Sequence, residues 1–116
     1  MIGAALLFNI GFAEAGNELA GRWSTTGATT ATVEIAMNDQ SQWVGVIAQC
    51  DTSEWIGKSL LTDFQQQSDQ TWKAILHSPK YSVSKEVNLE RVSPTELELV
   101  ADFVVFEKRF VWHSVP

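Results

Sequence analysis

The sequence is poor in cysteine and in positive charge. Cys50 is the one cysteine among 116 residues, so no disulfide can form within the chain, and a lone thiol is compatible with oxidising and reducing surroundings alike. Eight lysines and arginines stand against fourteen aspartates and glutamates, which gives a formal net charge of −6. Because no basic stretch compensates locally, we expect neither a nucleic-acid partner nor attraction to anionic membrane surfaces.

No apolar run is long enough to anchor the chain stably in a membrane, because residues 2–12 fall short of the roughly 20 residues that a spanning helix needs. The triplet Ala13-Glu14-Ala15 has the small-x-small form of a signal-peptidase site. Residues 1–15 are therefore predicted to be a signal peptide, which leaves a domain of residues 16–116 in the periplasm or outside the cell. A basic leader segment is missing, since the first basic residue is Arg22. The alternative is an N-terminal helix that caps one end of a cytoplasmic domain.

Motifs that carry chemistry are also scarce. His77 and His113 are the only histidines, and neither has a partner at metal-ligand spacing, so the sequence predicts no metal and no cofactor. No nucleophile elbow brings a serine, a histidine and an acid together. The one nucleophile–base pair that can be constructed is Cys50, followed by Asp51, with His77 across the fold. The favoured alternative is that Cys50 is a small buried apolar residue.

What the sequence does contain is apolar alternation with a period of two. Residues 30–37 alternate cleanly and predict a strand, and residues 38–41 have the Asn and Asp chemistry of a turn. Residues 43–50 predict the returning strand, in which Gly45 marks a bend, a bulge or a close backbone approach. Together they predict a hairpin.

The same pattern continues to the C-terminus. A polar connection over residues 51–57 leads to a strand over residues 58–64, and residues 65–70 are predicted to be a polar turn. Further strands are predicted over residues 72–78, 81–90, 96–105 and 109–115, with turns at Pro79, at residues 93–95 and near residues 107–108. About eight short sequential strands predict an all-β, up-and-down antiparallel barrel, because closure removes the exposed edges.

The segment Gly21-Arg22-Trp23 stands where the strands begin. Gly21 is predicted to let the backbone pass close to a neighbour, and Trp23 to fill one closed end of the barrel as a structural plug. A Gly-x-Trp triplet that opens an eight-strand pattern resembles the lipocalin and calycin barrels. The fuller similarity is to small exported bacterial lipocalin-like proteins, the domain-of-unknown-function family 2147. It rests on Trp43-Val44-Gly45-Val46-Ile47, Gly57-Lys58-Ser59-Leu60-Leu61, Trp72-Lys73-Ala74-Ile75, Pro79-Lys80-Tyr81 and Phe110-Val111-Trp112.

The resemblance implies a lipocalin-like barrel and export, and it implies no reaction. In such barrels an arginine often stacks on the tryptophan at the closed end. Arg109 is the nearest candidate for that arginine. Trp112, as an aromatic residue in a predicted strand, is predicted to be structural.

Aromatic side chains in the predicted strands have two interpretations. The favoured one places them in the core, and the alternative is that some line a cavity and face an apolar or aromatic ligand. The candidate ligand-binding aromatics are Trp43, Trp72, Tyr81 and Phe103. Strict alternation also puts Lys85 on the inward face, between Val83 and Val87, where it would meet a ligand carboxylate. The interpretation we favour is instead a bulge at Ser84-Lys85 that turns the lysine out to solvent.

Three functions follow as hypotheses. The leading one is a barrel that binds a small apolar or amphipathic molecule without transforming it, by analogy from the fold. The second is a side-chain-filled barrel that docks on another protein through residues 51–57 and Trp55, with a homodimer left open. The third, least favoured, is an enzyme that uses Cys50 and His77.

Overall fold

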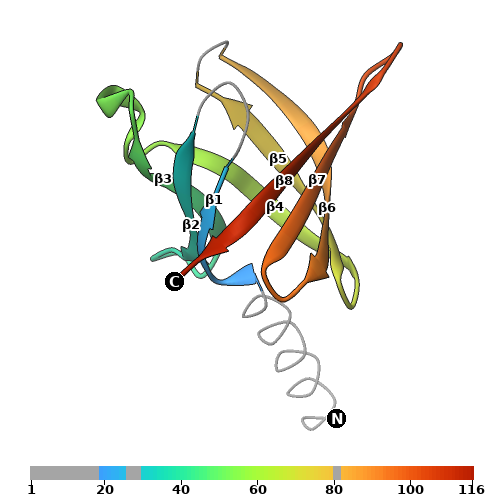
Figure 1. Cartoon of the computed structure of the whole chain (residues 1–116), viewed down its shortest axis with the longest axis horizontal. Coiled ribbons are helices and arrows are strands. Elements are labelled where there is room, and N and C mark those ends of the chain that lie inside the picture. The colour runs from blue at the N-terminus through green and yellow to red at the C-terminus, as the bar shows by residue number, and fades with distance from the viewer. Residues whose placement is uncertain (1–18, 26–29, 80–81) are drawn as a thin grey trace, which may run out of the picture.

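The computed structural model describes residues 19–25, 30–79 and 82–116, so the predicted signal peptide (residues 1–15) and Tyr81 lie outside the described residues. The strands form one closed barrel in sequence order, each antiparallel to the next, and the last pairs with the first (Figure 1). The predicted all-β, up-and-down barrel is confirmed. The strands are β1 (Gly21–Ser24), β2 (Ala31–Met37), β3 (Trp43–Cys50), β4 (Ser59–Ser68), β5 (Thr71–Ser78), β6 (Val83–Ser93), β7 (Glu96–Asp102) and β8 (Glu107–Val115), with a short 3-10 helix η1 (Ser53–Trp55) between β3 and β4.

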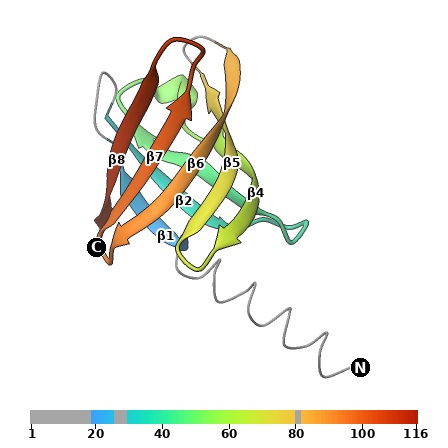
Figure 2. The ribbon, with the colours of Figure 1, turned by 90° about the vertical axis from the view of Figure 1, so that its right-hand side faces the viewer.

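The up-and-down order gives the barrel two different ends. At one end, which we call the floor, lie the C-terminus and the β2–β3, β4–β5 and β6–β7 turns (Figures 1 and 2). At the other, the rim, lie η1 and the β7–β8 turn, which is the upper tip of the red strands in Figure 2.

The floor is built on Trp23, which is 2% exposed and donates a hydrogen bond of 2.9 Å from its indole nitrogen to the carbonyl of Leu19. The guanidinium of Arg91 lies over the indole, 6.0 Å from its centroid, and donates a bond of 2.9 Å to the carbonyl of Pro94. The stacking arginine is therefore Arg91, and the expectation for Arg109 is wrong. Arg109 instead forms two ion pairs, with Glu98 and Glu107, on the outer surface.

Gly21 and Gly45 are needed for different reasons. Gly21 has a φ of 132°, which side chains other than that of glycine rarely adopt, but a Cβ there would meet nothing within 4 Å. The predicted close approach at Gly21 is therefore wrong, and the backbone conformation is what favours glycine. At Gly45 the close approach is real, because an added Cβ would lie 3.2 Å from the Cβ of Leu61.

Alternation along the strands sorts the side chains between the interior and the solvent. On β7, for example, Leu97 and Leu99 are fully buried while their neighbours Glu96 and Glu98 are partly exposed. Trp72 and Trp112 are 3% and 4% exposed, so both belong to the core. The core cluster comprises Leu19, Trp23, Val33, Ile35, Leu61, Trp72, Ala74, Val87, Leu89, Leu97, Leu99, Ala101 and Trp112.

Several predicted boundaries are wrong, and β6 runs to Ser93, the first residue of the predicted turn. β4 continues to Ser68 through the residues predicted as a turn, because register shifts on either side of Gln65 and Gln66 keep it paired with β5. β7 ends at Asp102, and the following turn is closed by a hydrogen bond of 2.7 Å from the amide of Phe103 to the carbonyl of Phe106. The two rings stack at 4.8 Å. The turn predicted near residues 107–108 is therefore wrong, because these residues begin β8.

Candidate functional site

Lys85 lies on the inner face of the barrel, near the rim. β5 and β6 pair from Thr71 to Ser78 without a register shift, so Lys85 stands opposite Leu76, which packs against the core. Residues directly opposite in an antiparallel pair share a face of the sheet. The bulge at Ser84-Lys85 that the sequence favoured is therefore wrong, and Lys85 is exposed because its place on the inner face is near the rim.

Lys108 is a second inner-face lysine at the same end. It stands opposite Ala101, which is 3% exposed, and next along that face Phe110 stands opposite the fully buried Leu99. The Nζ atom of Lys108 lies 5.5 Å from the ring centroid of Phe110, and the Nζ atom of Lys85 lies 5.2 Å from that of Phe103. Both lysines are therefore held against aromatic rings. We call Lys85, Phe103, Phe106, Lys108 and Phe110 the rim cluster.

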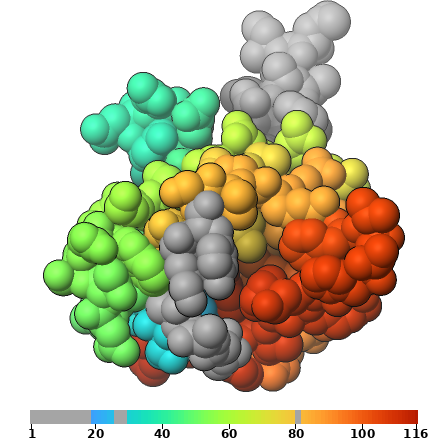
Figure 3. Space-filling model, turned by 90° about the horizontal axis from the view of Figure 1, so that it is seen from above, coloured from blue at the N-terminus to red at the C-terminus, as the bar shows by residue number. Residues whose placement is uncertain are grey.

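The rim cluster differs from the floor in exposure. Inner-face residues near the floor, such as Leu89 and Leu97, are 1% exposed or less, whereas Lys85, Phe103, Phe106 and Lys108 are exposed. Figure 3 looks onto this end, with the orange-red atoms of the β7–β8 turn on one side and the green atoms around η1 on the other. The rim thus offers two ammonium groups and several apolar rings to a molecule in solution.

The other predicted ligand-binding aromatics are placed elsewhere. Trp72 is buried in the core, and Trp43 is half-buried at the floor end of β3. The indole nitrogen of Trp43 is the one buried side-chain polar atom without a hydrogen-bond partner in the described ranges. Of that predicted set, Phe103 and Lys85 come together at the rim. Phe103 does so from a turn rather than from a strand.

The predicted pair of Cys50 and His77 is not formed. Cys50 is a half-buried free thiol opposite Ala31. Both ring nitrogens of His77 are engaged by hydroxyl groups, Nε2 with Thr62 at 2.7 Å and Nδ1 with Ser84 at 2.8 Å. The imidazole therefore has no nitrogen left to accept a proton from Cys50.

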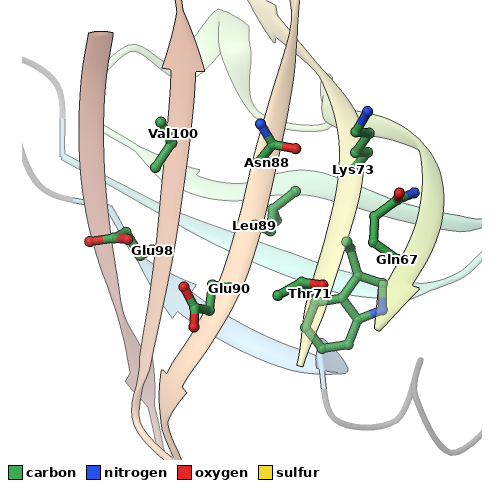
Figure 4. Close-up of a pocket in the computed structure, with 9 residues that line it drawn as sticks. Gln67, Thr71, Lys73, Asn88, Leu89, Glu90, Glu98 and Val100 are labelled. Atoms are coloured by element: carbon green, nitrogen blue, oxygen red, sulfur yellow. The ribbon is translucent and has the colours of Figure 1, made fainter. Parts of the chain in front are cut away.

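A depression of about 340 Å³ lies on the outer face of β4–β7 (Figure 4). Its polar walls are formed by Lys73, Asn88, Glu90 and Glu98, and the buried Trp72 and Leu89 also contribute to its lining. One ammonium and two carboxylates face an open surface there, which is the composition of a solvated sheet face. No three His, Cys, Asp or Glu side chains gather as a metal site within the described ranges.

The second hypothesis relied on Trp55, but that side chain is half-buried. The most exposed apolar residues are instead Val104 and Val105, at 103% and 86%, in the β7–β8 turn. Within the part of the chain that the structure describes, no helix is both long enough and apolar enough to cross a bilayer.

Comparisons with known protein families, with curated proteins and with solved structures found no match to this chain. Three members of the rim cluster, Phe106, Lys108 and Phe110, are absent from the predicted ligand-binding set. Counting back from Trp112 in steps of two gives Phe110, Lys108 and Phe106. This alternation can be recognised in the sequence once the turn is placed at residues 103–106.

Proposed function

We propose that this barrel binds a small amphipathic molecule at its rim, one with an apolar body and a single anionic group, and does not transform it. The observation that supports this most directly is the pair of inner-face lysines, Lys85 and Lys108, each held against a phenylalanine ring. A carboxylate or phosphate would accept charge-assisted hydrogen bonds from the two ammonium groups. The apolar body would pack on Phe103, Phe106 and Phe110.

The negative net charge of the chain means that an anionic ligand would depend on the positive charges nearest to it. The chain as a whole carries a net charge of −6, which repels anions at long range, so an anion must be held by nearby cations. Arg91, the inner-face arginine of β6, is engaged at the floor with Trp23 and Pro94. We therefore expect Lys85 and Lys108, on the inner face near the rim, to receive the anion.

The test compares decanoate with decanol, its uncharged counterpart, by isothermal titration calorimetry. Replacing both lysines (Lys85→Gln with Lys108→Gln) is expected to weaken decanoate binding about tenfold or more, because hydrogen bonds to charged groups contribute about 1.5–3 kcal/mol each. Decanol binding should change little. The matched control is Lys73→Gln, which removes a lysine from the outer face of β5. Absence of heat across a panel of fatty and aromatic acids, or an equal loss in the Lys73 variant, would contradict the proposal.

A second candidate, self-association through the β7–β8 turn, is favoured by the exposure of Val104 and Val105. Solvent contact with contiguous apolar side chains is unfavourable, and burying the turn against a second copy would remove it.

For this candidate we expect the apparent mass in light scattering to rise with protein concentration. Replacing both valines (Val104→Asp with Val105→Asp) should abolish that rise. Val92→Asp serves as the control, since Val92 is 48% exposed near the floor. A chain that stays monomeric at every concentration would eliminate this candidate.

A further inference from the structure

Four side chains on the outer face of the barrel form a continuous chain of hydrogen bonds across three strands. The Oδ2 atom of Asp63 lies 2.9 Å from the Thr62 hydroxyl on β4, and that hydroxyl lies 2.7 Å from Nε2 of His77 on β5. Nδ1 of His77 lies 2.8 Å from the hydroxyl of Ser84 on β6. His77 and Ser84 are directly opposite each other in the β5–β6 ladder, which holds this last contact in register.

The chemistry of the groups sets the direction of every bond in this chain. An ionised carboxylate only accepts hydrogen bonds, so the Thr62 hydroxyl donates its one proton to Asp63. The Thr62 oxygen must then accept from Nε2 of His77, and a neutral imidazole that carries its proton on Nε2 has a free lone pair on Nδ1. Ser84 therefore donates its hydroxyl proton to a basic nitrogen whose tautomer is set by Thr62 and Asp63.

We propose that Ser84 is the nucleophile and His77 the general base of an acyl-transfer site that acts on small activated esters at the outer face of the barrel. A nucleophile hydrogen-bonded to a base, with the base oriented by a third group, is the arrangement that activates serine in covalent catalysis. Thr62 and Asp63 are positioning residues. Ser84 is exposed, so an ester in solution can reach its oxygen.

The backbone around the site supports this assignment. Asp63 has a φ of 57°, in the left-handed region, and it lies in a register shift between β4 and β5. Ser82, two residues before the proposed nucleophile, has a φ of 55°. Residues other than glycine are held in this region at a cost, and such positions cluster at functional sites. The bulged backbone is what places the Asp63 carboxylate beside Thr62.

The reaction balances without a further reagent. The Ser84 oxygen attacks the acyl carbon while its proton passes to Nδ1 of His77, and a tetrahedral adduct forms. Collapse of the adduct breaks the ester bond, and the leaving alkoxide or phenolate takes the proton from His77. Water then attacks the acyl-serine by the same steps, which releases a carboxylic acid and restores the Ser84 hydroxyl.

The experiment measures covalent modification of the folded chain with a fluorophosphonate, in which the serine oxygen displaces fluoride from phosphorus. Peptide mapping by mass spectrometry identifies the modified serine and measures the rate at which the adduct forms. Ser84 is expected to react at least about 100-fold faster than Ser68, because a general base contributes about 10²–10⁴-fold. Ser68 is a matched internal control, since its hydroxyl lies 2.6 Å from that of Thr71, which is not a base. Equal reactivity of the two serines would overturn the proposal.

Variants separate a catalytic role from a structural one. His77→Gln should lower the rate at Ser84 about 100-fold. Thr62→Val should lower it as well, and Thr62→Ser should restore it, because the hydroxyl and not the methyl group links Asp63 to His77. A Ser68→Ala chain should react at Ser84 at the unaltered rate. Thermal unfolding of each variant verifies the fold, and an unchanged rate in His77→Gln would refute the assignment of the base.

Discussion

Replacing Trp23 with alanine is expected to lower the free energy of unfolding by about 3–5 kcal/mol. Trp23 is 2% exposed and fills the floor between Leu19 and Arg91, so truncation leaves a large cavity. It also removes the hydrogen bond from the indole nitrogen to the Leu19 carbonyl. Since small domains are stable by about 5–15 kcal/mol, the loss is a large share of the total.

Urea unfolding monitored by far-ultraviolet circular dichroism measures this loss. Trp23→Phe is the matched control, because it keeps an aromatic ring in the floor and gives up the hydrogen bond and part of the volume. We expect that variant to fall between the wild type and Trp23→Ala. A loss below about 1 kcal/mol for the alanine variant would mean that the floor does not depend on this side chain.

Leu61→Ala is expected to cost about 2–5 kcal/mol, for a reason specific to the β3–β4 seam. Leu61 is fully buried, and its cross-strand partners are Gly45 on β3 and Leu76 on β5. Because Gly45 contributes no side chain, the side chains of Leu61 and Val33 fill the space over it. The ladder between β3 and β4 contains two register pairs with a shift between them, so few backbone bonds compensate.

Amide hydrogen exchange is expected to show that the lost stability is concentrated where β3 pairs with β4. The amide of Ile47 bonds the carbonyl of Lys58 at 2.9 Å, and the amide of Gly57 bonds the carbonyl of Ile47 at 2.8 Å. Both amides are expected to exchange faster in Leu61→Ala. Leu61→Met, which keeps the volume, should cost less than about 1.5 kcal/mol and protect them. An exchange increase confined to other strands would contradict this account of the seam.

The architecture could be predicted because alternation and turn chemistry are local signals. The sequence predicts the hairpin of β2 and β3 that the structure contains, and it predicts a buried position for Trp23, which is 2% exposed. Strand ends were less predictable. Register shifts extend β4 through polar residues with little local signal, and stacking of Phe103 on Phe106 ends β7 three residues before the predicted boundary.

The candidate sites depended on contacts between distant residues. Strict alternation predicts that Lys85 lies on the inner face, and it does. The favoured alternative, a bulge that would turn Lys85 out to solvent, is wrong because β5 and β6 pair there without a register shift. The ring that its ammonium contacts belongs to a turn 18 residues later, and no local pattern pairs them. The sequence offers His77 as a base for Cys50, but the pairing of β5 with β6 puts His77 opposite Ser84 instead.

The order of polar and apolar residues was sufficient to predict the class of fold, its up-and-down connectivity and the tryptophan at its base, because burial imposes a two-residue period on every strand of a closed sheet. The arginine over Trp23, the two lysines at the rim and the partner of His77 followed from the register between strands. Register is set jointly by turns, bulges and packing across the whole barrel. The pattern along one strand predicts which face of the sheet each side chain is on. It does not predict which residue of the adjacent strand that side chain contacts.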